Sequence, residues 1–408
     1  MRQLNKNSVI IVSFYSIATI PLLKPNISSI SVIVFILLNL LFSSFKRNNN
    51  LAIQKKYVVL SIPFLLFFLY ELLSKSYNLK IILLNLPFLI FPLVFLYKPK
   101  YINPKVIDNT IKIFQISVLV QCFIYLIVFL KKNNIRELLN ISKENIPFFR
   151  EYVTSNYLIE MHPTYFSSFL LFSITFSLFK FKSNIVFNLL NLIISLFFIM
   201  LFSSRIILLI LLLTLTIYLS VQISKSRKKV IKFFGLFLVI TVIFIFNTDV
   251  VKNRFKEVMS QFNKPISGNY YNSTNTRIAI YKCNIQLTKE LPFFGYGNAL
   301  QNKLDDCYAK NYDSIFYKVN IFNTHNYYFY ILLYGGWFFL ILFLVYFYYI
   351  FTTLKNNMMH VVFFFQVLMI NLTENYLSRH YGLFLFCFFI TIFIYVNLNE
   401  RNPEFREI

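Results

Sequence analysis

The sequence predicts an all-α polytopic membrane protein with about twelve transmembrane helices and one large outer loop that contains short helices. Hydrophobic residues make up 57% of the 408 residues, or roughly 232 side chains, and twelve helices of about 20 residues need about 240. Charged residues make up only 14%, against about 25% in soluble domains. These proportions exclude an ordinary cytosolic enzyme, a disordered chain and a secreted disulfide scaffold.

Apolar runs separated by charged or Asn-rich segments mark the predicted spans. The first run is short and is interrupted near its end by Pro21, but it lacks the small-residue cleavage site of a signal peptide, so we expect a helix there as well. The predicted spans are residues 8–22, 27–45, 57–73, 79–97, 109–130, 162–179, 184–202, 205–222, 231–247, 326–351, 359–377 and 381–398.

Loop charge predicts the orientation. With a cytoplasmic N-terminus, the inner segments carry 19 Lys and Arg among 62 residues, whereas the outer turns at 23–26, 74–78 and 378–380 carry one each. Because Lys and Arg are enriched in short cytoplasmic loops, we expect both termini in the cytoplasm. The two longer loops, 131–161 and 248–323, then lie outside.

The chain divides into three predicted parts: residues 1–160 hold the N-terminal helices and the first outer loop, 161–398 form a second membrane domain that includes loop 248–323, and 399–408 form a cytoplasmic tail. Within the long loop, residues 277–290 predict a helix with Asn275 or Thr276 as its N-cap. Cys283 and Cys307 share this loop and could pair in an oxidising compartment, which the sequence leaves open.

Two arginines are candidates for binding an anion. Arg205 lies between two spans with almost no loop, which places it at the outer rim; the alternative is a snorkelling side chain at a helix end. Arg277 lies at the predicted start of the loop helix, where a helix N-terminus and a guanidinium together suit a phosphate or pyrophosphate. The alternative for Arg277 is a solvated surface residue.

Two further residues are candidates for proton transfer or charge pairing. His325 lies where the long loop re-enters the membrane, and an imidazole there can accept a proton from a substrate hydroxyl; the alternative is a merely hydrogen-bonded histidine. Glu374, near the outer end of the eleventh span, either pairs with Arg205, Arg277 or Arg379 or takes a direct catalytic role.

The remaining signals predict no metal and no cofactor. His162 precedes Pro163 at the start of a span, where it can cap the helix, and His360 lies on the inner side. The sequence has no Walker loop, no dinucleotide-binding glycine pattern, no zinc-spaced His and Cys cluster and no nucleophile elbow. Asp305 and Asp306 form its one adjacent acid pair in a polar loop, which is more typical of solvated residues than of a metal site.

Four elements in order carry a family resemblance. They are SSR at 203–205, NTRIAIYKCNIQLTKELPFFGYG at 275–297, NTHNYYFYILLYGG at 323–336 and TENYLSRHYG at 373–382. This pattern resembles the O-antigen ligase and polymerase superfamily of membrane glycosyltransferases, which use undecaprenyl-pyrophosphate-linked glycans at the periplasmic face. The similarity covers roughly residues 160–398, and the first five spans match only in number and hydrophobicity. Tyr281 stands where a Trp is common in the family.

The resemblance implies roles for individual residues. Arg205 and Arg277 match the two arginines that engage the pyrophosphate, and His325 matches the catalytic histidine of the ligases. Four further residues are possible supporting ones: Glu374, Arg379, Asn326 and Tyr281. The resemblance also implies a metal-independent, inverting transfer in the bacterial inner membrane, with the site facing the periplasm. Its partners would be the lipid-linked glycan donor, a lipid A-core or glycan acceptor, and membrane lipid, with no nucleic acid.

Several functions fit this resemblance. The His-Asn element favours O-antigen ligation to lipid A-core, and the alternative is a repeat-unit polymerase; a protein acceptor belongs to a related branch. A transporter of lipid-linked glycans is a rival from another class. Transporters tend to have internal repeats and ionisable residues near mid-membrane. Here the candidate residues gather at one face and a long loop connects them, which favours an enzyme.

Overall fold

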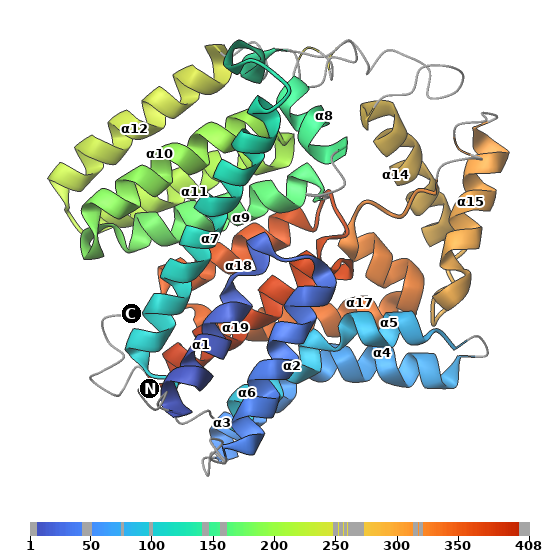
Figure 1. The fold of residues 1–408 in the computed structure, drawn as a ribbon. Helices are drawn as coiled ribbons and strands as arrows, with labels where there is room; N and C mark the ends of the chain where they lie inside the picture. Colours follow the sequence, from blue (N-terminus) through green and yellow to red (C-terminus); the bar gives the residue numbers. More distant parts are fainter. Residues whose placement is uncertain are drawn as a thin grey trace. The chain divides into compact units, whose positions relative to one another are not determined.

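The computed structural model has only helices as regular elements of its described residues, and Figure 1 shows the fold. It describes residues 6–42, 51–74, 77–97, 101–140, 147–155, 161–247, 252, 256, 259, 273–312, 317 and 321–399. The predicted tail beyond residue 399 and most of residues 248–272 lie outside these ranges. The all-α prediction is confirmed. The helices are α1 (Lys6–Ala18), α2 (Pro25–Leu41), α3 (Leu51–Leu60), α4 (Ile62–Leu73), α5 (Leu79–Asn85), α6 (Pro87–Leu96), α7 (Pro104–Leu130), α8 (Phe148–Ser155), α9 (Pro163–Phe179), α10 (Ile185–Phe202), α11 (Arg205–Ser224), α12 (Lys228–Asn247), α14 (Ser273–Lys289), α15 (Leu300–Asn311), α17 (Tyr327–Leu354), α18 (Met358–Ile370) and α19 (His380–Asn399).

The described helices make the chain a polytopic membrane protein, although the predicted count of twelve spans is not confirmed. Within the described ranges, six segments are long and apolar enough to cross a bilayer: Leu79–Leu96, Pro104–Leu130, Ile185–Phe202, Arg205–Ser224, Tyr327–Leu354 and His380–Asn399. The predicted span 57–73 is broken, because α3 and α4 meet at a bend of 47° where Pro63 lacks the N–H that a continuous helix needs. The apolar helices α2, α9 and α18 have 10–17 residues, fewer than the ~20 that span a bilayer upright.

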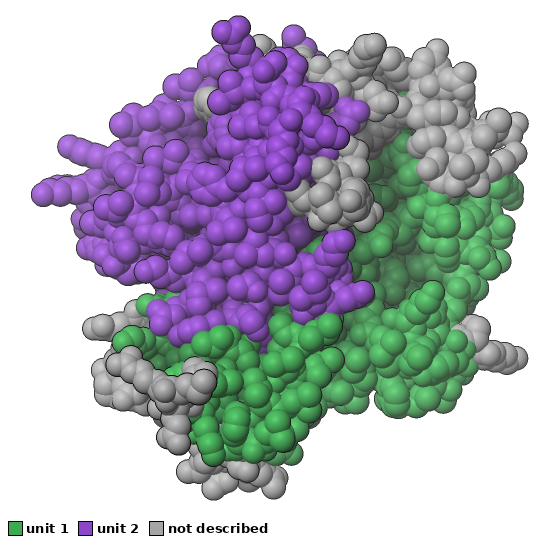
Figure 2. Space-filling view, viewed as in Figure 1, with its two compact units in different colours: residues 1–14, 29–108, 261–408 green, residues 15–28, 109–260 purple. Residues whose placement is uncertain are grey.

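The chain forms two compact units, which Figure 2 colours separately. Unit 1 comprises residues 1–14, 29–108 and 261–408, and unit 2 comprises residues 15–28 and 109–260. Both units are discontinuous in sequence. The predicted division near residue 160 rests on family similarity and stays a prediction.

In unit 2, helix α9 is the centre of the packing. Its side chains from Pro163 to Leu178 are all buried, and it packs against α10 and α11. Polar side chains connect α7, α9 and α10: Asn191 donates to the Ser177 hydroxyl at 2.7 Å, and Gln115 donates to the same hydroxyl at 2.8 Å. Such interhelical hydrogen bonds hold apolar helices together where lipid removes the usual hydrophobic driving force.

In unit 1, helix α19 is central. Of its apolar window, 83% is buried, against 39–50% for the other candidate spans, so those helices keep faces available for lipid. It packs against α6, α17 and α18. Aromatic pairs fill these contacts, including Phe388 with Phe91 and Tyr395 with Phe95, whose ring centroids lie 5.6 and 5.4 Å apart.

Helix α17 is interrupted at Gly336, where φ is +75° and ψ is −173°. The interruption frees carbonyl groups that a continuous helix would occupy, and unpaired backbone groups are costly inside a membrane. The Tyr296 N–H donates to the Leu333 carbonyl at 2.8 Å, and the Tyr70 hydroxyl donates to the Tyr334 carbonyl at 3.0 Å. The LPFFGYG segment and α4 therefore stabilise the break in α17.

Candidate active site

The predicted helix of the long loop is present, but it begins earlier than expected. Helix α14 begins at Ser273, so Asn275 and Thr276 lie inside its first turn and the prediction that either caps it is wrong. Arg277 is consequently the fifth residue of the helix. Residues 273–276, directly before it, belong to the same helix, and the predicted anion-binding role of Arg277 stays a prediction.

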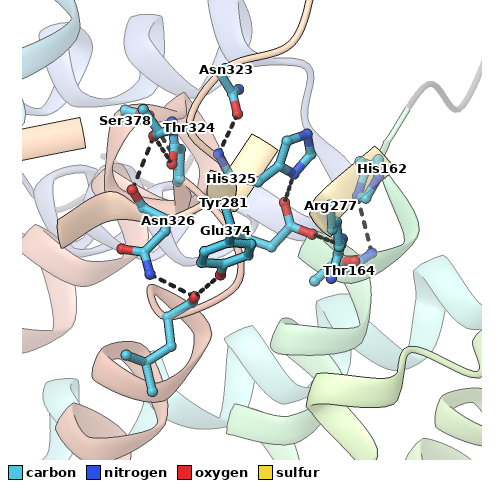
Figure 3. Close-up of polar contacts among 12 residues, drawn as sticks. His162, Thr164, Arg277, Tyr281, Asn323, Thr324, His325, Asn326, Glu374 and Ser378 are labelled. Atoms are coloured by element: carbon cyan, nitrogen blue, oxygen red, sulfur yellow. Dashed lines mark hydrogen bonds and ion pairs between the residues drawn. The ribbon is translucent and has the colours of Figure 1, made fainter. Parts of the chain in front are cut away.

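Arg277, Glu374 and His325 meet in unit 1 although they are far apart in sequence (Figure 3). The Arg277 Nη2 lies 2.6 Å from the Glu374 Oε1, and the Glu374 Oε2 lies 3.6 Å from the His325 Nδ1. The carboxylate side chain is only 6% exposed, whereas the guanidinium and imidazole side chains are 37% and 28% exposed. One buried carboxylate thus lies beside two groups that a substrate can reach.

The position of Glu374 determines which nitrogen of His325 is available. At 3.6 Å the Nδ1 is at ion-pair distance but too far for a hydrogen bond, and within the described part of the chain it has no other partner. Catalytic hydrogen bonds are often long before substrate binds. Since the carboxylate occupies the Nδ1 side, Nε2 is the nitrogen left for a substrate hydroxyl.

The turn that carries His325 is held in an uncommon backbone conformation. His325 has φ +43°, which costs a non-glycine residue roughly 1–2 kcal/mol. Asn323 Oδ1 accepts from the His325 N–H at 2.9 Å, Thr324 Oγ1 donates to Asn375 Oδ1 at 2.9 Å, and the Tyr327 N–H donates to the Asn371 carbonyl at 2.9 Å. These bonds fix the histidine turn against the segment that carries Glu374.

Tyr281 and Asn326, both predicted as supporting residues, converge on one carbonyl. The Tyr281 hydroxyl donates to the Leu372 oxygen at 2.6 Å and Asn326 Nδ2 donates to it at 2.9 Å. Burial raises the pKa of Tyr281, so its hydroxyl keeps its proton for this bond. Asn326 also caps α17 by accepting from the Phe329 N–H at 3.0 Å. These two residues position the Glu374 turn.

The structure distinguishes among the three arginines considered as partners of Glu374. Arg277 forms the ion pair. Arg379 is exposed and has no ion pair or hydrogen-bond partner through its side chain within the described ranges. Arg205 belongs to unit 2, where it begins α11 directly after Ser204 and the left-handed Ser203; its predicted role beside Arg277 stays a prediction.

Two other histidines have structural roles. His162 caps α9, because its Nδ1 accepts from the Thr164 N–H at 3.4 Å. His360 is buried, bonds through Nδ1 to the Asn397 Oδ1 at 2.9 Å and stacks on Phe393 with ring centroids 4.1 Å apart.

Glu71 is a residue that the sequence analysis did not single out. It is fully buried in α4, its Oε1 accepts from the Tyr334 hydroxyl, and its Oε2 accepts from the Asn78 N–H at 2.7 Å and Asn298 Nδ2 at 3.0 Å. It therefore links α4, the segment after LPFFGYG and the break in α17. A lone carboxylate inside an apolar run is the signal that would have found it.

A disulfide joins Cys283 of α14 to Cys307 of α15, the pairing that the sequence left open. These two helices lie side by side in Figure 1. Cys122 and Cys387 are free and buried. Within the described ranges, no group of three or more His, Cys, Asp or Glu side chains is placed to hold a metal ion.

Together the fold and the site define a polytopic membrane protein in which an arginine, a buried glutamate and an accessible histidine meet. Residues 190–344 match the family model described as O-antigen ligase, and this match supports membership of the O-antigen ligase and polymerase superfamily. At the level of that family, the match supports glycan transfer by a membrane glycosyltransferase-type enzyme. The matched range includes Arg205, Arg277 and His325 but not Glu374 or Glu71. No curated protein matches the chain.

Proposed function

We propose that the protein transfers a glycan from undecaprenyl pyrophosphate to a sugar hydroxyl at the periplasmic face of the bacterial inner membrane. The favoured reaction is O-antigen ligation to lipid A-core. The single observation that carries this proposal is the arrangement of Arg277 and His325 on the two oxygens of the buried Glu374.

In this mechanism His325 acts as the general base. Its Nε2 accepts the proton of the acceptor hydroxyl while the hydroxyl oxygen bonds to the anomeric carbon of the donor and the bond from that carbon to the pyrophosphate breaks. A single displacement of this kind inverts the anomeric configuration. General-base help is worth roughly 10²–10⁴-fold in rate, and Glu374 at the Nδ1 side stabilises the imidazolium that forms.

Arg277 acts on the leaving group. A guanidinium has five N–H donors, so Arg277 can keep Nη2 on Glu374 and direct others to the phosphate oxygens. A fixed donor aimed at developing charge is typically worth about 2.7–4 kcal/mol, which makes this contribution comparable with that of the base. The proposal assigns to Arg277, and to Arg205 by family resemblance, the charge neutralisation that a divalent cation gives in many glycosyltransferases.

The placement of the site at the periplasmic face has two supports. The loop charges predict that the long loop lies outside, and the Cys283–Cys307 disulfide lies in that loop. Disulfides persist in the periplasm and are rare in the cytosol.

The test is the profile of lipopolysaccharide and carrier-linked glycan in a deletion strain. The strain is complemented with wild type, with His325→Ala, or with His162→Asn, a matched control that keeps an N-cap residue on α9. For a ligase, the His325→Ala strain accumulates long polymer on the lipid carrier while lipid A-core stays bare, and the control strain resembles wild type.

Two other profiles would change the assignment. A core that carries a single repeat with no ladder indicates a polymerase with the same site chemistry. No change in either pool with His325→Ala contradicts both transfer reactions, and a protein that moves lipid-linked glycan across liposomes without making a glycosidic bond would be a transporter.

A further inference from the structure

A cavity of about 300 Å³ lies within unit 1, near the site in sequence but lined by different residues. Side-chain amides dominate its polar lining, and two tyrosine rings and several aliphatic side chains complete it. We call it the amide pocket; its lining includes Asn78, Asn298, Gln301, Asn375, Tyr330 and Tyr334.

The lining of the amide pocket is chemically suited to a hydroxyl-rich ligand. Each amide offers both a donor and an acceptor, as each sugar hydroxyl does. The aliphatic residues Ile81, Leu84 and Leu304 also line the cavity and suit the apolar faces of a pyranose ring. Arg379 is the one charged residue among the lining residues, so the pocket is poorly suited to a pyrophosphate with several negative charges.

Some of these amides have polar atoms left for a ligand. Asn375 is 3% exposed; its Oδ1 accepts from Thr324, while its Nδ2 has no partner among the residues that the structure describes. Gln301 Nε2 donates to Asp305 Oδ1 at 2.9 Å and to the Phe322 carbonyl at 3.1 Å, which leaves Gln301 Oε1 available. Two residues of the pocket lining, one with a free donor and one with a free acceptor, therefore have hydrogen-bonding capacity left for a ligand.

The buried Glu71 fixes one wall of the pocket. It bonds to the Tyr334 hydroxyl, to Asn298 Nδ2 and to the Asn78 N–H. The Tyr330 and Tyr334 rings stack with centroids 5.6 Å apart and an interplanar angle of 24°. A wall held in this way loses little conformational entropy when a ligand binds.

The pocket adjoins the catalytic turn along the chain. Asn323 and Thr324 directly precede His325, and Asn375 directly follows Glu374. In the view of Figure 3, Thr324 and Ser378 lie to the left of His325 and Arg277 lies to its right. Residues of the pocket lining and of the catalytic group are therefore direct neighbours on both turns.

We propose that the amide pocket binds one uncharged, hydroxyl- or acetamido-bearing sugar ring of the glycan that reacts at His325. This inference rests on the proposed function and deepens it by assigning a sugar subsite. The ring comes either from the acceptor or from the donor glycan, which share this chemistry, and the experiment separates the two.

The experiment measures binding of two water-soluble probes to the purified full chain in lipid nanodiscs by titration calorimetry. One probe is the delipidated core oligosaccharide, and the other is the glycan released from the lipid carrier by mild acid. The test variant is Gln301→Leu, which keeps the size of the side chain and removes both polar atoms. The matched control is Gln286→Leu on α14, which loses a hydrogen bond to Asn311 of 2.9 Å outside the pocket.

The expected result is that Gln301→Leu weakens binding of one probe by about threefold to tenfold, the range for one or two lost hydrogen bonds, while Gln286→Leu binds as wild type does. The affected probe identifies the acceptor or the donor as the source of the sugar. Failure of both probes to bind wild type, or equal affinities for Gln301→Leu and wild type, overturns the proposal.

Transfer assays on the same preparations separate this failure from failure of the proposed function. If Gln301→Leu binds normally while His325→Ala abolishes transfer, the pocket assignment is wrong and the proposed reaction stands. If wild type binds a probe through Gln301 but neither wild type nor His325→Ala alters any glycan pool, the proposed reaction is wrong and the pocket is a sugar site of another activity.

Discussion

Arg277 is the residue whose charge the proposed reaction needs most. We expect Arg277→Ala to abolish measurable transfer, because one lost donor to developing charge costs about 10²–10³ in rate and also leaves Glu374 buried without its cation. Arg277→Lys should recover only part of the transfer activity, since one ammonium group cannot reproduce the several guanidinium donors that bind carboxylate and phosphate together. The measurement is transfer rate in membranes, with the exposed Lys282→Ala of α14 as control. Substantial activity in Arg277→Ala would count against the mechanism.

Glu374 offers a second test at the residue scale, because it lies beside the proposed base, His325, and has no direct contact with the acceptor hydroxyl in the proposed mechanism. Glu374→Gln keeps the shape of the side chain but removes the charge that stabilises the His325 imidazolium. We expect transfer to slow by about tenfold or more, with most of the loss in kcat and little in KM, since binding groups are unchanged. A normal kcat with a raised KM would instead assign Glu374 to substrate binding.

At this scale, motif spacing predicted the residue types but not their partners. The sequence named Arg277, His325 and Glu374 as candidates and left three arginines as partners of the acid. Only the fold brings α14 against the turn after α18 and so selects Arg277. Glu71 could have been found from its place in an apolar run, but its partners Tyr334 and Asn298, more than 200 residues away in the sequence, could not.

At the scale of elements, the break in α17 depends on two glycines in contact. A Cβ added to Gly336 would lie 2.0 Å from the Phe293 carbonyl oxygen, and one added to Gly295 would lie 2.4 Å from the Tyr334 oxygen; both residues also have positive φ. We expect Gly336→Ala and Gly295→Ala to lower thermal stability in detergent markedly. Gly235→Ala in α12 is the control, because a Cβ there meets nothing within 4 Å and Ala favours a helix over Gly. Equal melting temperatures for Gly336→Ala and Gly235→Ala would contradict this account of the break.

The helices were predictable from the sequence where a long apolar run alone determined them. Long apolar runs gave α7, α10, α11 and α17, whose ends fall near the predicted boundaries. The start of α14 was placed too late because Ser, Thr and Asn favour caps and turns over helix interiors, yet Ser273 to Thr276 continue the helix. The bend between α3 and α4 required attention to Pro63, which a hydrophobicity window ignores.

At the scale of the whole molecule, the predicted orientation places Lys289 and Lys355 on opposite sides of the membrane. Both residues are exposed; Lys289 is the last residue of α14, and Lys355 directly follows α17. We expect Lys289→Cys to be labelled by an impermeant maleimide in cells with a permeabilised outer membrane, and Lys355→Cys only after the inner membrane is disrupted. The native cysteines give little background, since two form the disulfide and two are buried. The reverse pattern would overturn the periplasmic assignment.

Composition sufficed to predict that the molecule is a membrane protein, but not how its chain divides into two compact units. A chain with 57% hydrophobic residues can satisfy its backbone in a bilayer only as helices or a closed barrel, and the helical choice followed from the length of the runs. The chain alternates between the two units along its sequence, so that residues 15–28 belong to unit 2 and residues 29–108 to unit 1. Contacts between segments far apart in the sequence define such units, and the local patterns of a single sequence do not reveal these contacts.

We propose that the protein uses His325, Glu374 and Arg277 to transfer a glycan without a metal ion. The most direct test uses the purified protein in nanodiscs with carrier-linked glycan, delipidated acceptor and excess EDTA, and follows formation of the new glycosidic bond. The account predicts that wild type forms an inverted linkage at a rate that EDTA leaves unchanged, and that His325→Ala forms none. Transfer by His325→Ala at the wild-type rate, or loss of wild-type transfer on adding EDTA, would contradict it.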